Sequence, residues 1–164
     1  MKNDSDISDT DLMKRRKNVM PRIIPPTLVS ASQPVAFYAY MNSFSQPSIP
    51  AHMTLTFDTV IINDGNGYSK HDGVFIVPVN GIYAFHWSLK IKQHSWASVE
   101  IIVNGRSIGC ASTDSAGSLG TGSELIVTHA NAGDHVFLRT QEAVAGYIYS
   151  NNRARSSFSG WLMH

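Results

Sequence analysis

Alternation of apolar and polar residues predicts a chain built from short β-strands. The strictest run covers residues 81–87, where three aromatic rings leave one face of a single strand. A continuous apolar run at 74–77 precedes it, as is typical of a strand buried on both faces. An Asn-Gly pair at 80–81 stands between the two runs and favours a tight hairpin with positive φ. We therefore expect Phe75 and Tyr83 to pack in the core from opposing strands of one hairpin.

Further runs of this kind recur along the chain and are separated by turn signals. We expect a loop at 46–50, where two prolines remove two backbone donors, and another at 111–122, which is rich in Ser, Thr and Gly. Residues 93–96 and 147–155 are also expected to be loops. The other predicted strands include 35–40, 53–57, 97–103, 124–128, 136–140 and 158–163. About ten short strands with no convincing helix indicate an all-β sandwich or barrel.

Composition and charge narrow the class of protein. A chain of 164 residues with 43% hydrophobic and 15% charged residues is typical of one globular domain. The formal net charge of +1 argues against a nucleic-acid partner. No stretch approaches the ~20 apolar residues of a membrane-spanning helix, which argues against membrane insertion. Residues 1–33, with a basic cluster at 14–17, are expected to form a flexible polar and charged tail before a domain at 34–164.

Aromatic, asparagine and glycine positions between 57 and 87 resemble the signature of the C1q globular-head family, which shares its fold with tumour necrosis factor. The matching residues are Phe57, Asn63, Tyr68, Phe75, Gly81, Tyr83, Phe85 and Trp87. Trp87 departs mildly, because the family usually has Phe or Tyr at that position. The segment 156–162 resembles the closing strand of the family. The resemblance covers residues 34–164.

This resemblance implies a ten-stranded antiparallel jelly-roll sandwich of the C1q/TNF-like type, whose first and last strands pair and which associates as a homotrimer. It implies a soluble pattern-recognition, lectin-like protein that binds carbohydrate, lipopolysaccharide or other microbial surface ligands in innate immunity. The alternative is a cytokine-like ligand that engages a protein receptor. We expect a secreted protein, but no signal-peptide core is visible, so an intracellular location or non-classical export stays open. No Gly-X-Y repeat is present, so the collagen stalk of some relatives is not expected here.

Residues that could support catalysis form no recognisable pattern. The seven histidines show no His-x-His pair and no His-Glu-x-x-His motif. Cys110 stands alone in an apolar setting, where a thiol is usually inert packing. The glycines of 117–122 lack the spacing and the following lysine of a phosphate loop. We therefore expect no enzymatic activity, and we expect His86 to lie at a surface or interface, on the side of its strand opposite the aromatic rings.

A calcium site is suggested by the resemblance, since some relatives hold Ca²⁺ near the trimer axis. Asp114 lies in a comparable place in this sequence. Backbone carbonyls together with Asp114 from neighbouring subunits could supply the oxygen ligands that calcium needs. The alternative is a turn aspartate that accepts hydrogen bonds from its own backbone. No other cofactor is expected.

Ligand binding is expected in the two loops at 93–96 and 147–155, because binding groups favour loops on a rigid scaffold. Their aromatic rings can stack on sugar faces, their amides can donate and accept, and their arginines suit phosphate or carboxylate. The alternative is that the tyrosines pack on the end of the barrel and the arginines are only solvated. The candidate residues are His94, Trp96, Tyr147, Tyr149, Asn151, Asn152, Arg153 and Arg155.

Overall fold

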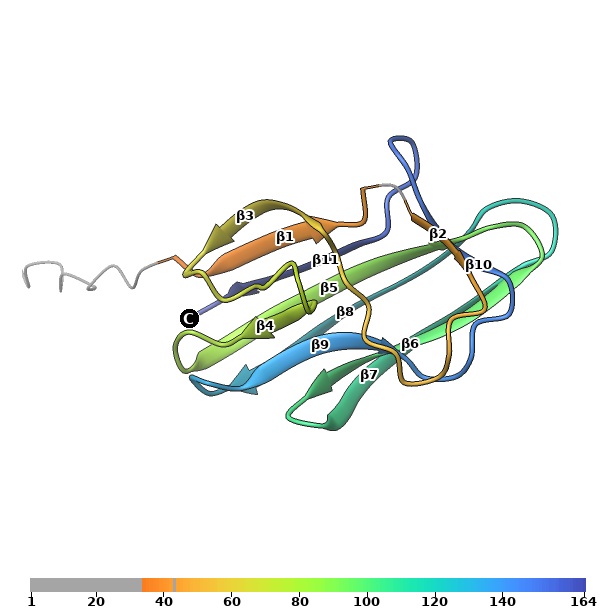
Figure 1. Ribbon diagram of the computed structural model, residues 1–164. Coiled ribbons are helices and arrows are strands. Elements are labelled where there is room, and N and C mark those ends of the chain that lie inside the picture. The colour runs from red at the N-terminus through yellow and green to blue at the C-terminus, as the bar shows by residue number, and fades with distance from the viewer. Residues whose placement is uncertain (1–33, 43) are drawn as a thin grey trace, which may run out of the picture. The chain divides into compact units, whose positions relative to one another are not determined.

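The computed structural model describes residues 34–42 and 44–164, and in this part of the chain every regular element is a β-strand (Figure 1). No helix there is long and apolar enough to cross a membrane. The strands are β1 (Ala36–Tyr40), β2 (Phe44–Pro47), β3 (Thr59–Asp64), β4 (Val74–Ile76), β5 (Gly81–Ile91), β6 (Ser95–Val103), β7 (Arg106–Ser115), β8 (Gly120–Ala130), β9 (His135–Thr140), β10 (Tyr147–Ser150) and β11 (Ser157–Leu162). The predicted tail, residues 1–33, lies outside the described residues.

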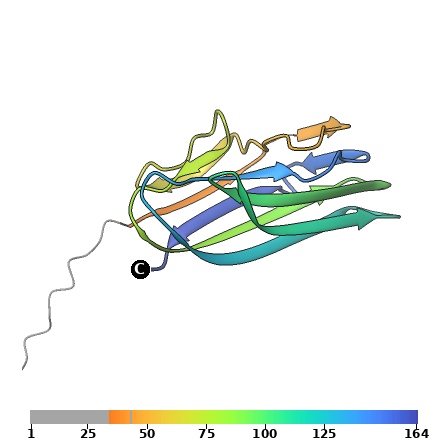
Figure 2. The same cartoon turned by 90° about the horizontal axis from the view of Figure 1, so that it is seen from below.

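The strands form two antiparallel sheets that enclose one core (Figure 2). The larger sheet has seven strands in the order β2-β10-β5-β11-β1-β3, with β8 paired to β5. The smaller sheet has four strands in the order β4-β9-β6-β7. The first and last strands, β1 and β11, pair from Ala36 with Trp161 to Tyr40 with Ser157. The predicted antiparallel jelly-roll sandwich is therefore confirmed, with eleven strands in the described residues rather than ten.

The aromatic rings predicted to leave one face of β5 form the centre of the core. Tyr83, Phe85 and Trp87 are each at most 1% exposed. Phe75, from the opposite sheet, packs edge-on against Tyr83 and Phe85 with ring centroids 6.1 and 5.9 Å apart. The same ring stacks on Phe37 of β1 at 4.7 Å. These rings therefore bridge the two sheets, and the predicted core positions of Phe75 and Tyr83 are correct.

The hairpin predicted at 80–81 is wrong, because β4 and β5 belong to different sheets. β4 pairs with β9, and the residues after it carry the chain from one sheet to the other. The side-chain oxygen of Asn80 accepts a hydrogen bond from the backbone N–H of Ala132 at 2.7 Å, which ties this crossover to the turn between β8 and β9. Gly81 does not have a positive φ. Its missing side chain instead leaves room for Leu162, which a Cβ would overlap.

Two predictions for the segment 46–57 also differ from the structure. β2 includes Pro47, which was predicted to lie in a loop. A proline is tolerated there because β2 is at the edge of its sheet, where no second neighbour needs the missing donor. The strand predicted at 53–57 is reduced to a single bridge between Thr54 and Arg139. Leu55 and Phe57 are buried but Met53 is 41% exposed, so the alternation of 53–57 predicted the burial only in part and did not predict the pairing.

Two predicted loops contain strand. β7 runs to Ser115 and β8 begins at Gly120, so only 116–119 remains of the loop predicted at 111–122. A Cβ on Gly120 would lie 3.0 Å from the Cβ of Ser115. Small residues therefore let β7 and β8 approach closely. The same small residues gave the segment a loop-like composition, which is why the strands were not predicted. β10 likewise occupies the first four residues of the loop predicted at 147–155.

Candidate functional site

The outer face of the seven-stranded sheet, which points away from the core, carries an uncovered apolar surface that we call the apolar face. Strand register places its residues in two neighbouring rows, Val127, Ala84, Trp161 and Ala36, and then Leu125, His86, Ser159, Tyr38 and Ile62. Leu125 and Val127 are 55 and 57% exposed, and Trp161 and Ile62 are each 41% exposed. His86 lies on this face, as predicted. Contiguous exposed apolar surface of this kind marks an interaction site.

The outer face of the four-stranded sheet is mixed by contrast, because polar side chains that pair with one another lie there beside apolar ones such as Ile76. Nε of Arg139 donates a hydrogen bond to Oε1 of Glu100 at 2.7 Å and forms a salt bridge with it. Burial alone would raise the pKa of Glu100, but hydrogen bonds from Ser107 and Arg139 and the positive charge of the arginine hold it below its ordinary value. Ser98 donates to the side-chain oxygen of Gln141 at 2.8 Å. These polar groups find partners within one subunit, so this face is less suited to self-association than the apolar face.

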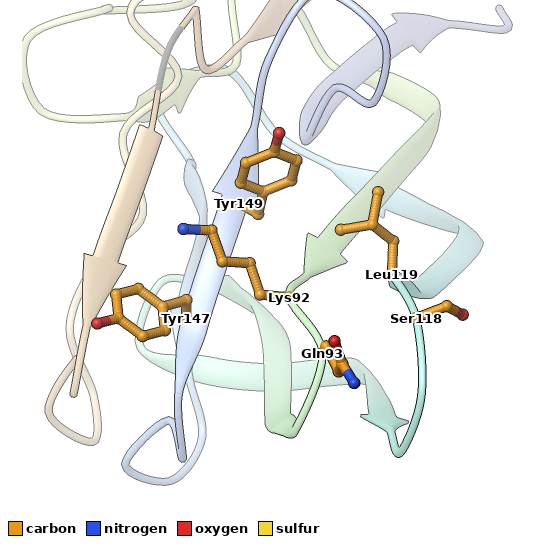
Figure 3. A pocket seen from close by; sticks show the side chains of 6 residues that line it. All are labelled: Lys92, Gln93, Ser118, Leu119, Tyr147 and Tyr149. Carbon is orange, nitrogen blue, oxygen red and sulfur yellow. The ribbon is translucent and has the colours of Figure 1, made fainter.

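Beyond the apolar face, the same sheet carries an open groove that we call the lysine–tyrosine groove (Figure 3). Its volume is about 630 Å³. Its lining consists of Lys92, Gln93, Ser118, Leu119, Tyr147 and Tyr149. The two tyrosines belong to β10 and point outward, because Ile148 between them is fully buried in the core. The serine and the leucine come from the short connection between β7 and β8.

Lys92 follows the last residue of β5 and lies across both tyrosine rings (Figure 3). Its Nζ is 4.7 Å from the ring centroid of Tyr147 and 5.4 Å from that of Tyr149. Its backbone N–H donates to the carbonyl of Tyr147 at 3.1 Å. Among the described residues it takes part in no salt bridge. Its ammonium group is therefore available to an anionic or hydroxyl-bearing ligand, and the tyrosines supply an apolar surface beside it.

Gly146 and Ser95 fix the position at which β10 begins. Gly146 has a φ of 91°, a conformation that side chains rarely adopt, and a Cβ on it would collide with the hydroxyl of Ser95. That hydroxyl accepts a hydrogen bond from the backbone N–H of Tyr147 at 2.9 Å. The start of β6 therefore holds the first tyrosine of the groove in place.

The structure brings only part of the predicted ligand set together. The two predicted tyrosines line the groove. His94 borders it, since its Nε2 lies 3.1 Å from Nε2 of Gln93, which is in the lining. Trp96, however, lies on β6 in the other sheet, where its register partner is Asp114 of β7. Trp96 is therefore not part of the groove.

The turn that follows β10 carries the other predicted residues. The side-chain oxygen of Asn151 accepts two backbone hydrogen bonds within this turn, at 2.9 and 2.8 Å, so it shapes the turn. Asn152 and Arg153 are exposed. The guanidinium of Arg155 lies 3.9 Å from the ring centroid of Tyr40, on the outer face of the seven-stranded sheet. Arg155 is therefore on the same side of the sheet as the groove.

Four lining residues were not among the predicted candidates: Lys92, Gln93, Ser118 and Leu119, of which only Gln93 lies in a loop predicted to bind ligand. A signal for the lysine exists in the sequence, because Lys90 and Lys92 alternate with apolar residues and so lie on the outward side of one strand. No comparable signal exists for Ser118 and Leu119. Their composition is that of an ordinary turn, and only the pairing of β8 with β5 brings them beside β10.

The structure of a single subunit does not support the calcium site predicted at Asp114. Asp114 is exposed on β7. The described residues contain no group of three or more His, Cys, Asp or Glu side chains that could hold a metal ion. Calcium takes about six to eight oxygen ligands, so a site at Asp114 would need ligands from other subunits. Cys110, predicted to be inert packing, is exposed instead, because it lies on the outer side of β7, at the edge of the four-stranded sheet.

Comparison with known protein families identifies the domain. The family model of the C1q domain matches residues 36–163. The chain belongs to the C1q domain family. The resemblance carried by the aromatic and glycine positions of 57–87 is therefore confirmed.

Two relatives of this C1q domain are much longer proteins. The mouse (Mus musculus) collagen alpha-1(X) chain is 29% identical over 150 residues, which is 87% of this chain and 22% of the collagen. Human (Homo sapiens) multimerin-2 is 28% identical over 144 residues, which is 88% of this chain and 14% of multimerin-2. The chain thus spans less than a quarter of either relative.

Solved structures share the fold of this C1q domain at low sequence identity. The globular domain of zebrafish complement 1qA has a TM-score of 0.61 at 17% identity, covering 79% of this chain and 98% of the zebrafish domain. The Eiger TNF of S. frugiperda has a TM-score of 0.62 at 8% identity, covering 81% and 94% of the two chains. Murine APRIL has a TM-score of 0.58 at 12% identity, covering 80% and 100%. These similarities confirm the C1q/TNF-like jelly roll.

Proposed function

We propose that this C1q domain is a binding module that forms a homotrimer and recognises carbohydrate, lipopolysaccharide or other microbial surface ligands outside the cell. The observation that carries the proposal is the lysine–tyrosine groove, where an ammonium group lies across two tyrosine rings in an open hollow of about 630 Å³. A phosphate or carboxylate can accept a charge-assisted hydrogen bond from such a lysine. A sugar ring can pack against the tyrosines at the same time.

The homotrimer is supported by the apolar face. Leu125 and Val127 on β8 and Trp161 on β11 lie on either side of β5 and are each more than 40% exposed in the single subunit. Water is removed from this surface if a second copy covers it, which is favourable by roughly 25 cal/mol per Å² of apolar area. In a trimer the apolar face of each copy meets a different surface of the next copy, and such head-to-tail contacts between identical chains form a closed ring when the rotation closes.

Assembly also strengthens binding to a repetitive surface. One groove open to solvent is expected to bind a sugar or a phosphate weakly. Three copies on one trimer raise the overall avidity by about 10²-fold or more, provided that the ligands are spaced to match. Microbial envelopes present such repeated ligands, which is why we place the protein outside the cell.

Substitution of Lys92 by glutamine tests the groove. Lys92→Gln keeps most of the side-chain length but loses the charge, and we expect it to weaken binding of the full chain to immobilised lipopolysaccharide by about tenfold, a loss of ~1.4 kcal/mol. The measurement is surface plasmon resonance at low and high salt, because an ionic contact is screened by salt. Lys70→Gln is the matched control, since it removes one charge from an exposed turn outside the groove. Equal affinity and equal salt dependence in wild type and Lys92→Gln would place the site elsewhere.

A glycan array separates this proposal from the cytokine-like alternative. A microbial-surface binder is expected to retain glycans or lipopolysaccharide without any other protein. A ligand of a protein receptor is expected to ignore free sugars. Full-length protein that binds none of the arrayed saccharides or lipopolysaccharides would favour the receptor ligand.

A further inference from the structure

We propose that the outer face of the four-stranded sheet carries a second ligand site, which binds uncharged saccharides and is separate from the lysine–tyrosine groove. The inference goes beyond the proposed function and does not depend on the homotrimer. It starts from two residues that the sequence indicated for different reasons, Trp96 for ligand binding and Asp114 for calcium. The structure makes them cross-strand partners, as the second residue of β6 and the next-to-last residue of β7.

Both side chains of this pair lie on the outer face, because their neighbours Ala97 and Thr113 are buried. Residues directly opposite each other on antiparallel strands have Cβ atoms about 4.5–5.5 Å apart. Asp114 is exposed and Trp96 is half-buried. On the other side of Trp96 lies Ala145, which is exposed and exchanges two backbone hydrogen bonds with it, at 2.7 and 3.0 Å. The two cross-strand neighbours of the indole are therefore a short carboxylate and a methyl group, which are too small to cover it.

The next outward row of this sheet carries hydrogen-bonding groups. Ser98 and Ser112 are register partners, and the backbone N–H of Gln141 donates to the carbonyl of Ser98 at 2.9 Å. The hydroxyl of Ser112 donates to that of Ser98 at 3.0 Å, which donates in turn to the side-chain oxygen of Gln141 at 2.8 Å. This row lies about 7 Å from the row of Trp96, two residues along β6 at ~3.3 Å per residue. The hydroxyl groups of a saccharide on the indole can therefore reach it.

This hydrogen-bonded row is preorganised for a ligand. Ser98 is only 2% exposed, and its hydroxyl is held by a neighbour on each side. Because Ser98 occupies the side-chain oxygen of Gln141, the amide nitrogen remains as the donor that a ligand can use. Ser112 is exposed and keeps lone pairs that can accept. Binding to side chains that are already ordered costs less conformational entropy than binding to free ones.

These groups match the chemistry of a neutral sugar. The C–H groups of a pyranose ring can pack on the large apolar surface of the Trp96 indole. The carboxylate of Asp114 can accept hydrogen bonds from two hydroxyls, and such charge-assisted bonds are stronger than neutral ones. The amide of Gln141 can donate to a further hydroxyl. A cationic ligand would use the indole and the carboxylate but would leave the hydrogen-bonding row without a function.

The charge of this site distinguishes it from the lysine–tyrosine groove. The one salt bridge among the described residues joins Glu100 to Arg139, so no described residue neutralises Asp114 or the exposed Glu142 that follows Gln141. A phosphate or carboxylate group on a ligand would be repelled by these two carboxylates. Uncharged saccharides are therefore expected here, and lipopolysaccharide, which carries phosphate groups, is expected at the groove.

Isothermal titration calorimetry of the full chain with maltohexaose, mannohexaose and chitohexaose, all uncharged, tests the site. The titrations are made in EDTA, so that no saccharide is held through calcium. Trp96→Ala is expected to weaken binding by about tenfold or more, and Trp96→Phe, which keeps an aromatic ring, to restore most of it. Gln141→Ala is also expected to bind about tenfold more weakly. Ile76→Ala is the matched control, because it truncates an exposed apolar residue at the opposite end of the same sheet.

Loss of affinity in Trp96→Ala and Gln141→Ala, with wild-type affinity in Ile76→Ala, supports the site. Wild-type affinity in both Trp96→Ala and Gln141→Ala would overturn it, and so would a wild-type protein that binds none of the three saccharides. Circular dichroism establishes the fold of each variant. If Trp96→Ala does not fold, Gln141→Ala decides alone, because its side chain is exposed. None of these results bears on the binding of lipopolysaccharide by Lys92→Gln, which tests the groove separately.

Discussion

Phe75→Ala is expected to lower the free energy of unfolding by about 3–5 kcal/mol. The Phe75 side chain is fully buried and contacts rings from both sheets, with centroid distances of 4.7 Å to Phe37, 6.1 Å to Tyr83 and 5.9 Å to Phe85. Its removal leaves a cavity between aromatic rings that cannot collapse without moving a strand. A domain of this size is stabilised by about 5–15 kcal/mol, so the loss should be evident in urea unfolding and in the melting temperature.

Ile76→Ala is the matched control for this variant. Ile76 is the next residue of β4, points to the other side of the sheet and is 46% exposed. Its truncation is expected to cost less than about 1 kcal/mol. Equal losses in the two variants, or a melting temperature of Phe75→Ala close to that of wild type, would contradict the packing of Phe75 between the sheets.

The double variant Leu125→Asp, Val127→Asp is expected to be a folded monomer. Both side chains are more than half exposed in the single subunit, so the fold itself should tolerate the change. In a trimer each copy would bury two carboxylates in apolar surroundings without partners, which is strongly unfavourable. Light scattering should therefore give the chain mass of 18.0 kDa for the variant and about three times that mass for wild type.

Ile76→Asp controls for the introduction of a charge on an exposed apolar residue. Ile76 lies on the four-stranded sheet, away from the apolar face, and this variant is expected to remain a trimer. Far-ultraviolet circular dichroism establishes whether each variant is folded. A double variant that is still trimeric would show that the subunits associate through another surface.

Much of the fold follows from alternation, because one buried face per strand is what a two-sheet sandwich requires. The rings of Tyr83, Phe85 and Trp87 show this directly, since all three lie in the core. Pairing partners were harder to predict, because they depend on residues far away in the sequence. The Asn-Gly pair at 80–81 has the composition of a hairpin turn, yet its asparagine bonds to Ala132 and the chain crosses between sheets.

The candidate site was only half predictable for a related reason. The segment 147–155 was predicted from its aromatic, amide and arginine side chains, and two of its residues, Tyr147 and Tyr149, line the groove. The ring of Trp96 was predicted to bind ligand for the same reason, but the alternation of β6 directs it to the outer face of the other sheet. The same alternation, applied to β5, predicts that Lys92 points outward. Leu119 reaches the groove only through the long-range pairing of β8 with β5.

Hydrogen–deuterium exchange of the full chain, with and without lipopolysaccharide, locates the ligand site directly. We expect slower amide exchange on binding at 92–93, at 117–119 and at 147–149, which are the three segments that form the lysine–tyrosine groove. The four-stranded sheet should exchange at the same rate in both conditions, since its outer face lies on the other side of the core. Protection confined to that sheet, or no change at a ligand concentration that saturates binding, would contradict the assignment of the groove as the ligand site.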